Sequence, residues 1–451
     1  MLWRRVMTPV SSQPEPPRPS SFARVVGRLW GANVVIVLSG LIAGPITARA
    51  LGVEGRGELA AITAVLTMVP WVLDFGLSLW IARERAIGRS RAELLGAALP
   101  AALACSLIGV AAAIPLSHAL GGGRDVVVTF LQIGLFLAPV SVVLQTLVGL
   151  AIGEARWRLF AAARIVGSVL PVIVIVVLLV TDQLTVGSAA AAYLGGGLVG
   201  SLIIVPVVRG AGRPRFDLRR ARAATAFGAK SWLSTVAGTA NNRLDQVLMA
   251  GLVTSRELGF YAIAVTVGGV TNGLIGAVSN ALIPRVAMGD GALAARSCRV
   301  TVGTVALAGT LLAAVTPAML PFVFGADFAD AVPMTLILLG ASVPMAAAFV
   351  LTAALNAADD PGAAMRAEVV SLAFTVPALI VLLPAYGGIG AAAISLVAYS
   401  IRLAIQLASA QRVFRRRWLS FVVPTVGDLR WLARRARRRK ETQVSGGAGG
   451  R

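Results

Sequence analysis

Residues 159–180, LFAAARIVGSVLPVIVIVVLLV, form a run of 22 residues in which Arg164 is the only charged side chain. An α-helix needs about 20 apolar residues to cross a lipid bilayer, so this run predicts a membrane span. The whole chain has the same character, with 451 residues, 57% of them hydrophobic and 14% charged, and a mean hydropathy of +0.82. Soluble domains carry about 25% charged residues. The composition therefore excludes a soluble enzyme, and the uninterrupted runs exclude an outer-membrane barrel.

Similar apolar runs recur along the chain with short breaks between them. Each is long enough to cross the membrane as a helix. The predicted fold is an all-α polytopic membrane protein with about twelve transmembrane helices. The predicted spans are 30–50, 58–81, 94–116, 125–151, 159–180, 185–208, 228–252, 258–283, 299–323, 330–356, 364–385 and 387–410.

Basic residues are concentrated in every second loop between the predicted spans, and we call these loops the breaks. One set of breaks, together with both tails, holds 35 of the 41 Lys and Arg residues, and only Lys230 and Lys440 are lysines. Positive loops are retained in the cytoplasm, so the pattern predicts two cytoplasmic termini and an even number of spans. The net charge of +21 is thus explained by topology, and we expect no nucleic-acid partner. The strong preference for Arg over Lys suggests a bacterial protein of the plasma membrane.

An internal repeat relates the two halves of the chain. Three identical pairs are 202 residues apart: Gly57 and Gly259, Arg83 and Arg285, and Arg164 and Arg366. A constant offset near half the folded length predicts two six-helix bundles around a central cleft. The predicted segments are a disordered cytoplasmic tail (1–23), an N-terminal bundle (24–208), a basic cytoplasmic linker (209–227), a C-terminal bundle (228–411) and a basic cytoplasmic tail (412–451).

Several short motifs resemble the polysaccharide/O-antigen flippase family. Thr47–Gly57 (TARALGVEGRG) and Leu73–Leu77 (LDFGL) are similar to the family's first two spans. Asn241–Leu248 (NNRLDQVL), Glu257–Ala262 (ELGFYA) and Leu282–Arg285 (LIPR) are similar to the start of its second half. The family belongs to the multidrug/oligosaccharidyl-lipid/polysaccharide exporter superfamily, some of whose members have up to fourteen spans.

The resemblance implies a transporter rather than an enzyme. It would move a polyprenyl-diphosphate-linked oligosaccharide or polysaccharide precursor to the outer leaflet by alternating access. The implied partners are this lipid-linked glycan, the bilayer, a polysaccharide polymerase and glycosyltransferases. We expect no cofactor and no metal. The arginine-rich tail from Arg412 to Lys440 predicts contact with anionic lipids.

Charged side chains inside a membrane span are costly, so they are the candidate functional residues. A glycolipid diphosphate would be bound by arginine, whose guanidinium pairs with phosphate oxygens. A coupling H⁺ or Na⁺ would need a carboxylate, for which the candidates are Asp74 and Asp245. The candidate substrate-binding residues of the cleft are Arg28, Arg49, Asn241, Arg243, Asp245 and Arg402.

Each candidate has a structural alternative. The arginines Arg28, Arg49, Arg164 and Arg402 could extend to lipid head groups. Asp74 could bond a neighbouring helix, and Asp245 could pair with an arginine as a lock between the halves. At the level of function, the alternatives are a drug or cation antiporter of the same superfamily, with an acidic cavity, and a membrane enzyme or scaffold.

Overall fold

The computed structural model describes residues 19–271 and 291–427, except residues 215, 242, 359, 424 and 426. Within these residues the chain is helical throughout, without a strand. Eight helices are apolar and long enough to span a membrane. The two longest are each broken at one glycine, so each supplies two crossings. With the shorter helices, the described part of each predicted span is mostly helical, which confirms an all-α membrane protein. Residues 272–283 of the predicted span 258–283 lie outside the described residues.

The first half of the chain contains six crossings. They are built from α1 (Pro19–Leu73), α2 (Leu77–Ala86), α3 (Arg91–Gly121), α4 (Asp125–Gly153), α5 (Trp157–Val180), α6 (Val186–Leu202) and the short η1 (Val205–Val208). Helix α1 reverses direction at Gly52, where φ is 69° and ψ is −175°. This left-handed φ is accessible to glycine at no steric cost. The helix begins at Pro19, inside the segment 1–23 that the sequence predicts as disordered.

The second half follows the same plan. It contains α7 (Leu218–Asn241), α8 (Leu244–Leu252), α9 (Ser255–Gly268), α11 (Gly291–Phe324), η2 (Ala326–Ala331), α12 (Val332–Ala357), α13 (Pro361–Phe414) and α14 (Leu419–Val422). Helix α13 reverses at Gly387, where φ is 51°. The motif Leu282–Arg285 and most of the predicted lipid-binding tail lie outside the described residues.

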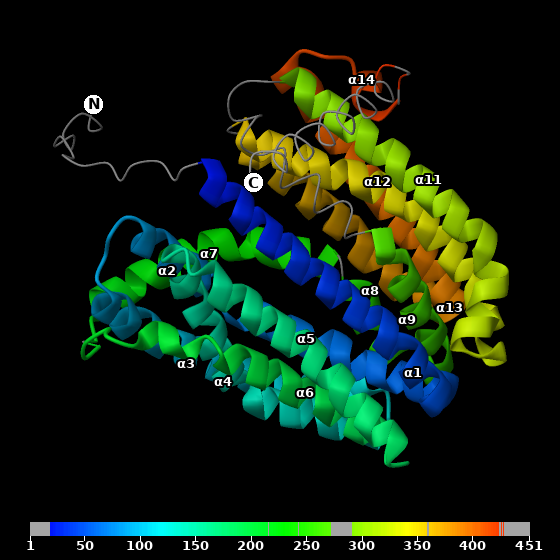
Figure 1. The fold of residues 1–451 in the computed structure, drawn as a ribbon, viewed down its shortest axis with the longest axis horizontal. Coiled ribbons are helices and arrows are strands. Elements are labelled where there is room, and N and C mark those ends of the chain that lie inside the picture. The colour runs from blue at the N-terminus through cyan, green and yellow to red at the C-terminus, as the bar shows by residue number, and fades with distance from the viewer. Residues whose placement is uncertain are drawn as a thin grey trace, which may run out of the picture.

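The 202-residue offset relates whole helices of the two halves. Moved by 202 positions, α3 spans 293–323 and α4 spans 327–355, which nearly coincide with α11 and α12. In the same way, α5 and α6 fall on the two arms of α13. The repeat that three residue pairs predicted is therefore visible in the helix order. In Figure 1 the two groups of helices lie at lower left and upper right, with α1 and α9 side by side where they meet.

The halves share a hydrophobic core at one end and have separate cores at the other. We call the end with residues 52–58, 121–125, 253–258 and 325–331 the closed end, and the end with the arginine-rich breaks the basic end. At the closed end one buried cluster combines residues of both halves, including Leu59, Leu131, Tyr261 and Phe324. Toward the basic end each half has its own cluster. The halves are thus joined at the closed end and packed separately toward the basic end.

Two glycines of the repeat lie at a close backbone contact between the halves. A β-carbon on Gly57 would lie 1.8 Å from the carbonyl oxygen of Ser255, and one on Gly259 would lie 2.1 Å from that of Val53. Real β-carbons do not approach so closely, so only glycine fits here. The pair that revealed the repeat therefore packs across it.

At the basic end the buried side chain of one glutamate links several interhelical loops of the first half. Glu154 accepts hydrogen bonds from Arg85 (Nε–Oε1, 2.8 Å) and Arg91 (Nη2–Oε2, 2.8 Å), and pairs with Arg156 (Nε–Oε2, 2.9 Å). Arg91 also donates to the carbonyl oxygen of Arg209, at the start of the linker. Burial by itself would raise the pKa of the Glu154 carboxyl, but the hydrogen bonds from Arg91 and Arg85 outweigh it. Its pKa therefore lies below the usual value.

We expect Glu154→Gln to lower the thermal unfolding midpoint of the purified protein at neutral pH. Because the folded-state pKa is depressed, the carboxylate stabilises the fold above the unfolded-state pKa of about 4.3. This contribution is lost as the pH falls through the folded-state pKa. The difference in midpoint between wild type and variant should therefore shrink on acidification. Glu93→Gln, at an exposed carboxyl of the same region, is the control. Equal midpoints of wild type and Glu154→Gln at pH 7 would contradict the assignment.

Candidate functional site

The second crossing is interrupted between α1 and α2, at Asp74. Phe75 and Gly76 both have left-handed φ values, 50° and 72°. Non-glycine residues rarely adopt this conformation, which marks a constrained break. The buried Asp74 carboxylate satisfies the groups that the break exposes, accepting from the backbone N–H of Ser78 (3.2 Å) and its hydroxyl (2.7 Å). Thr146 of α4 donates a further bond (3.2 Å).

Helix α7, the first of the second half, docks onto this break. Trp232 stacks on Phe75 with ring centroids 4.8 Å apart, and its indole N–H donates to the carbonyl oxygen of Val72 (2.7 Å). A β-carbon on Gly228 would lie 2.1 Å from the carbonyl oxygen of Phe75. The constrained turn is therefore held by a helix from the other half of the sequence.

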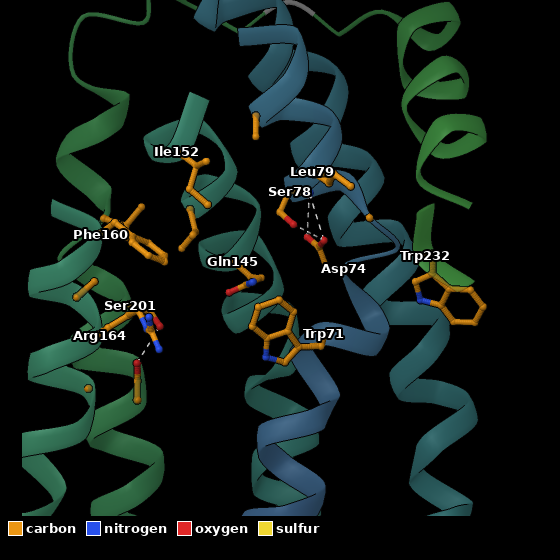
Figure 2. A pocket seen from close by; sticks show the side chains of 17 residues that line it. Trp71, Asp74, Ser78, Leu79, Gln145, Ile152, Phe160, Arg164, Ser201 and Trp232 are labelled. Atoms are coloured by element: carbon orange, nitrogen blue, oxygen red, sulfur yellow. Dashed lines mark hydrogen bonds between the residues drawn. The ribbon is translucent and has the colours of Figure 1, made fainter. Parts of the chain in front are cut away.

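A cavity of about 650 Å³ lies beside Asp74, within the range typical of small-molecule sites. Its walls come from α1, α2, α4, α5 and α6, and Trp232 of α7 completes them. In the view of Figure 2, Gln145 and Trp71 lie between Arg164 on one side and Asp74 on the other. The cavity thus combines aromatic rings, an amide and two opposite charges.

Two polar side chains of this cavity have no protein partner. Among the residues that the structure describes, the Gln145 amide and the Arg164 guanidinium form no hydrogen bond or ion pair. Arg164 is exposed and lies over the ring of Phe160, 5.6 Å from its centroid. Free donors facing a cavity are available to a ligand, and a guanidinium suits phosphate oxygens.

Comparison with known proteins identifies the family. A family model described as "Polysaccharide biosynthesis protein" matches residues 23–289, more than half of the chain. The chain belongs to this polysaccharide biosynthesis family. The resemblance drawn from the sequence motifs is thereby confirmed. No curated protein matches the chain.

The fold of this family member is similar to that of solved transporters. A structure titled "Lipid II flippase MurJ, inward closed conformation" superposes with a TM-score of 0.73 at 12% identity, covering 86% of this chain and 89% of the other. An inward-facing multidrug MATE transporter gives 0.65 at 14% identity, with 84% and 94% covered. A Vibrio cholerae MATE transporter gives 0.51 at 15%, with 89% and 100% covered. The chain therefore shares the fold of these membrane transporters.

In this polysaccharide biosynthesis protein, the predicted site residues do not form one cluster. Asp74 lines the cavity, but Arg49 lies at the closed end, where its Nε donates to the carbonyl oxygen of Val323 (3.0 Å) and Nη2 to that of Phe322. Arg49 thus caps the C-terminal end of α11 in the other half. Arg28 is exposed on the first arm of α1 and has no partner among the described residues.

The predicted pair Arg243 and Asp245 lies at the start of α8, and the two side chains have different partners. Arg243 is exposed at the start of α8 and reaches Gln246 (Nη1–Oε1, 3.5 Å). Asp245 turns into the second half, where it accepts from the hydroxyl of the fully buried Tyr261 (2.5 Å). The partner of Asp245 is thus a tyrosine, not the arginine that the structural alternative expected. The side chain of Asn241 lies outside the described residues.

Arg402 is buried, with 3% of its surface exposed, so it does not extend to lipid head groups as one alternative expected. Its Nη2 pairs with Glu368 (Oε1, 2.5 Å), and its guanidinium lies over the ring of Phe349 (5.1 Å). In this conformation Arg402 therefore cross-links the two arms of α13. Within the part of the chain that the structure describes, its Nε and Nη1 have no partner.

Sequence reasoning missed Glu368 as a site residue and Gln145 and Arg164 as members of one cavity. A partial signal for Glu368 was present, because it lies 19 residues before the turn at Gly387 and Arg402 lies 15 residues after it, a difference of about one helical turn. Two antiparallel arms bring such positions to the same height. No comparable sequence signal placed Arg164 beside Gln145, because α4 and α5 meet only through the packing of the whole half.

Proposed function

We propose that this protein carries a polyprenyl-diphosphate-linked oligosaccharide from the cytoplasmic to the outer leaflet of a bacterial plasma membrane. The observation that carries the proposal is the unpaired Arg164 guanidinium in a large cavity of a polysaccharide biosynthesis family protein. A diphosphate cannot cross hydrocarbon unaided and needs cationic donors in a polar cavity. Glycosyltransferases would supply the lipid-linked glycan, and a polymerase would use it after export.

Two arginines receive distinct roles in this proposal. Arg164 binds the diphosphate inside the first half, and the exposed Arg243, at the α7–α8 break, meets it between the halves. The basic end faces the cytoplasm, as the distribution of arginines predicts. The joined closed end then faces outward, so the structure represents a state that loads from the cytoplasm. Asp74 is the proposed site of a coupling cation, because its carboxylate lines the same cavity.

We expect Arg164→Ala to reduce surface polysaccharide about tenfold or more in a deletion strain of the source organism, at normal membrane abundance of the protein. Arg164→Lys should restore export only in part, because lysine keeps the charge but loses the paired donors. Arg243→Ala should also reduce export. The control is Arg158→Ala, an exposed arginine on the same helix that does not line the cavity. Normal export by Arg164→Ala would remove this residue from the site.

A drug antiporter is the second candidate, favoured by the Asp74 carboxylate in the cavity. An aromatic cation such as ethidium would pair with Asp74 and stack on Trp71. Under this alternative the deletion strain becomes sensitive to ethidium and keeps its surface polysaccharide. Under our proposal the polysaccharide is lost and ethidium resistance does not change.

A further inference from the structure

The cavity at Asp74 continues toward the closed end. A second cavity of about 290 Å³ shares Trp71, Gln145, Gly167, Gly197 and Ser201 with the first. Together they form one groove through the first half, which we call the N-half groove. It begins near Arg164 and ends near Tyr193, and its walls are the second arm of α1 and the helices α4, α5 and α6.

The far part of the N-half groove is lined by hydroxyl groups. Thr63 donates to the carbonyl oxygen of Leu59 (2.8 Å), Thr67 to that of Thr63 (2.7 Å), and Ser141 to that of Leu137 (3.3 Å). Each hydroxyl thus uses its proton within its own helix and keeps oxygen lone pairs as acceptors. The groove therefore offers acceptors in its far part, and free donors, Gln145 and Arg164, in its near part.

The second half has no such lining at the equivalent positions. Under the 202-residue offset, Gly167 corresponds to Val369, Gly197 to Tyr399 and Gly200 to Arg402. Gln145 corresponds to Ala347, which is buried in an apolar cluster. Glycines thus leave room in the first half where larger side chains stand in the second. The asymmetry indicates that the groove is a feature of one half and not a consequence of the shared fold.

We propose that the N-half groove binds the sugar chain of the substrate, with Thr63, Thr67, Ser141 and Tyr193 selecting among glycans. This inference rests on the proposed function and names the part of the substrate that the first half recognises. Sugar hydroxyls both donate and accept, so they satisfy the hydroxyl acceptors and the free donors at once. A polyprenyl tail would leave the Gln145 amide and the Arg164 guanidinium without a hydrogen-bond partner, at a cost for each. The aromatic face of Trp71 provides an apolar surface for a sugar ring.

The position of the diphosphate determines in which direction the sugar chain of the substrate runs along the groove. With the diphosphate at Arg164, the first sugar lies between Gln145 and Trp71. The following sugars extend toward Tyr193 and the closed end. Substitutions in the far part should therefore change which glycans are exported, whereas substitutions at Arg164 should reduce the export of all of them.

Gly197 and Gly195 offer a matched test. A β-carbon on either glycine would meet no atom within 4 Å, so a larger side chain is accommodated at both positions. Only Gly197 lines the groove. We expect Gly197→Leu to reduce surface polysaccharide about tenfold, a difference of about 1.4 kcal/mol, and Gly195→Leu to leave it unchanged. Equal export by both variants would overturn the proposal.

A second measurement does not depend on export. A groove that holds sugar must contain water, so cysteine at Ser141 should react with a charged, water-soluble thiol reagent after Cys105 and Cys298 are replaced by alanine. Gly197→Leu should slow this reaction, and Gly195→Leu should not. An unreactive Ser141→Cys would overturn the groove proposal. A deletion strain with normal polysaccharide but a reactive Ser141→Cys would instead overturn the proposed function and leave a water-filled groove.

Discussion

Replacing Gly57 with valine is expected to abolish polysaccharide export. The closed end forms only if Gly57 lies against the backbone of Ser255, with no room for a β-carbon. A clash of this kind costs about 1–3 kcal/mol or more. The halves would then separate at the closed end, and the state that loads substrate from the basic end would be depopulated. The measurement is surface polysaccharide in the complemented deletion strain.

The control for this prediction lies on the same helix. Gly40 is exposed and a β-carbon there would meet no atom within 4 Å, so Gly40→Val should fold and export normally. Separation of the halves should also expose the closed end. Cysteine at Val53, which is buried against Gly259, should react faster with an impermeant thiol reagent in Gly57→Val than in wild type. Normal export by Gly57→Val would show that the close contact is not required.

Arg402→Ala is expected to destabilise the second half by about 3–5 kcal/mol, because it removes the cation that Glu368 faces in a buried setting. The readout is the thermal unfolding midpoint of the purified protein, together with its abundance in the membrane. The double variant Arg402→Met, Glu368→Gln removes both charges and should recover most of the loss. Arg412→Ala, at an exposed arginine of the same helix, is the control. A stable but inactive Arg402→Ala would return Arg402 to the substrate-binding residues.

The twelve crossings were predictable from the sequence because each depends on local composition. Even the contact between Gly57 and Gly259 was indicated in the sequence, because the two glycines repeat at the fixed offset of 202 residues. The helix break at Asp74 was not predicted from the sequence, because it depends on the hydrogen bond from Thr146 and on the docking of Trp232. Helix propensity and hydropathy describe one segment at a time and do not report which segments meet.

Because the sequence does not report which segments meet, it also did not show which of the arginines inside the spans have a protein partner. A charge inside a span indicates that something compensates it, but the compensating group can be a ligand, a carboxylate or a backbone carbonyl. Arg402 has a carboxylate partner and Arg49 has the end of a helix. Arg164 lies over the ring of Phe160 but forms no hydrogen bond or ion pair with the described residues. It was a weaker candidate in the sequence because it lies near the end of its span. Unpaired donors become visible only when the neighbours are known.

The docking of α7 on the first half has consequences for how a two-half protein could evolve and for where the chain could be cut into two polypeptides. Trp232 belongs by sequence to the second half but packs on the first, through Phe75 and Val72. Two free copies of an ancestral half would each need this helix from the other, as in a domain-swapped dimer. Fusion into one chain makes the exchange permanent. A two-chain version of the protein is therefore better cut at the break after Asn241 than in the linker, since that cut keeps α7 with α1, α2 and α3, although it separates α7 from α13.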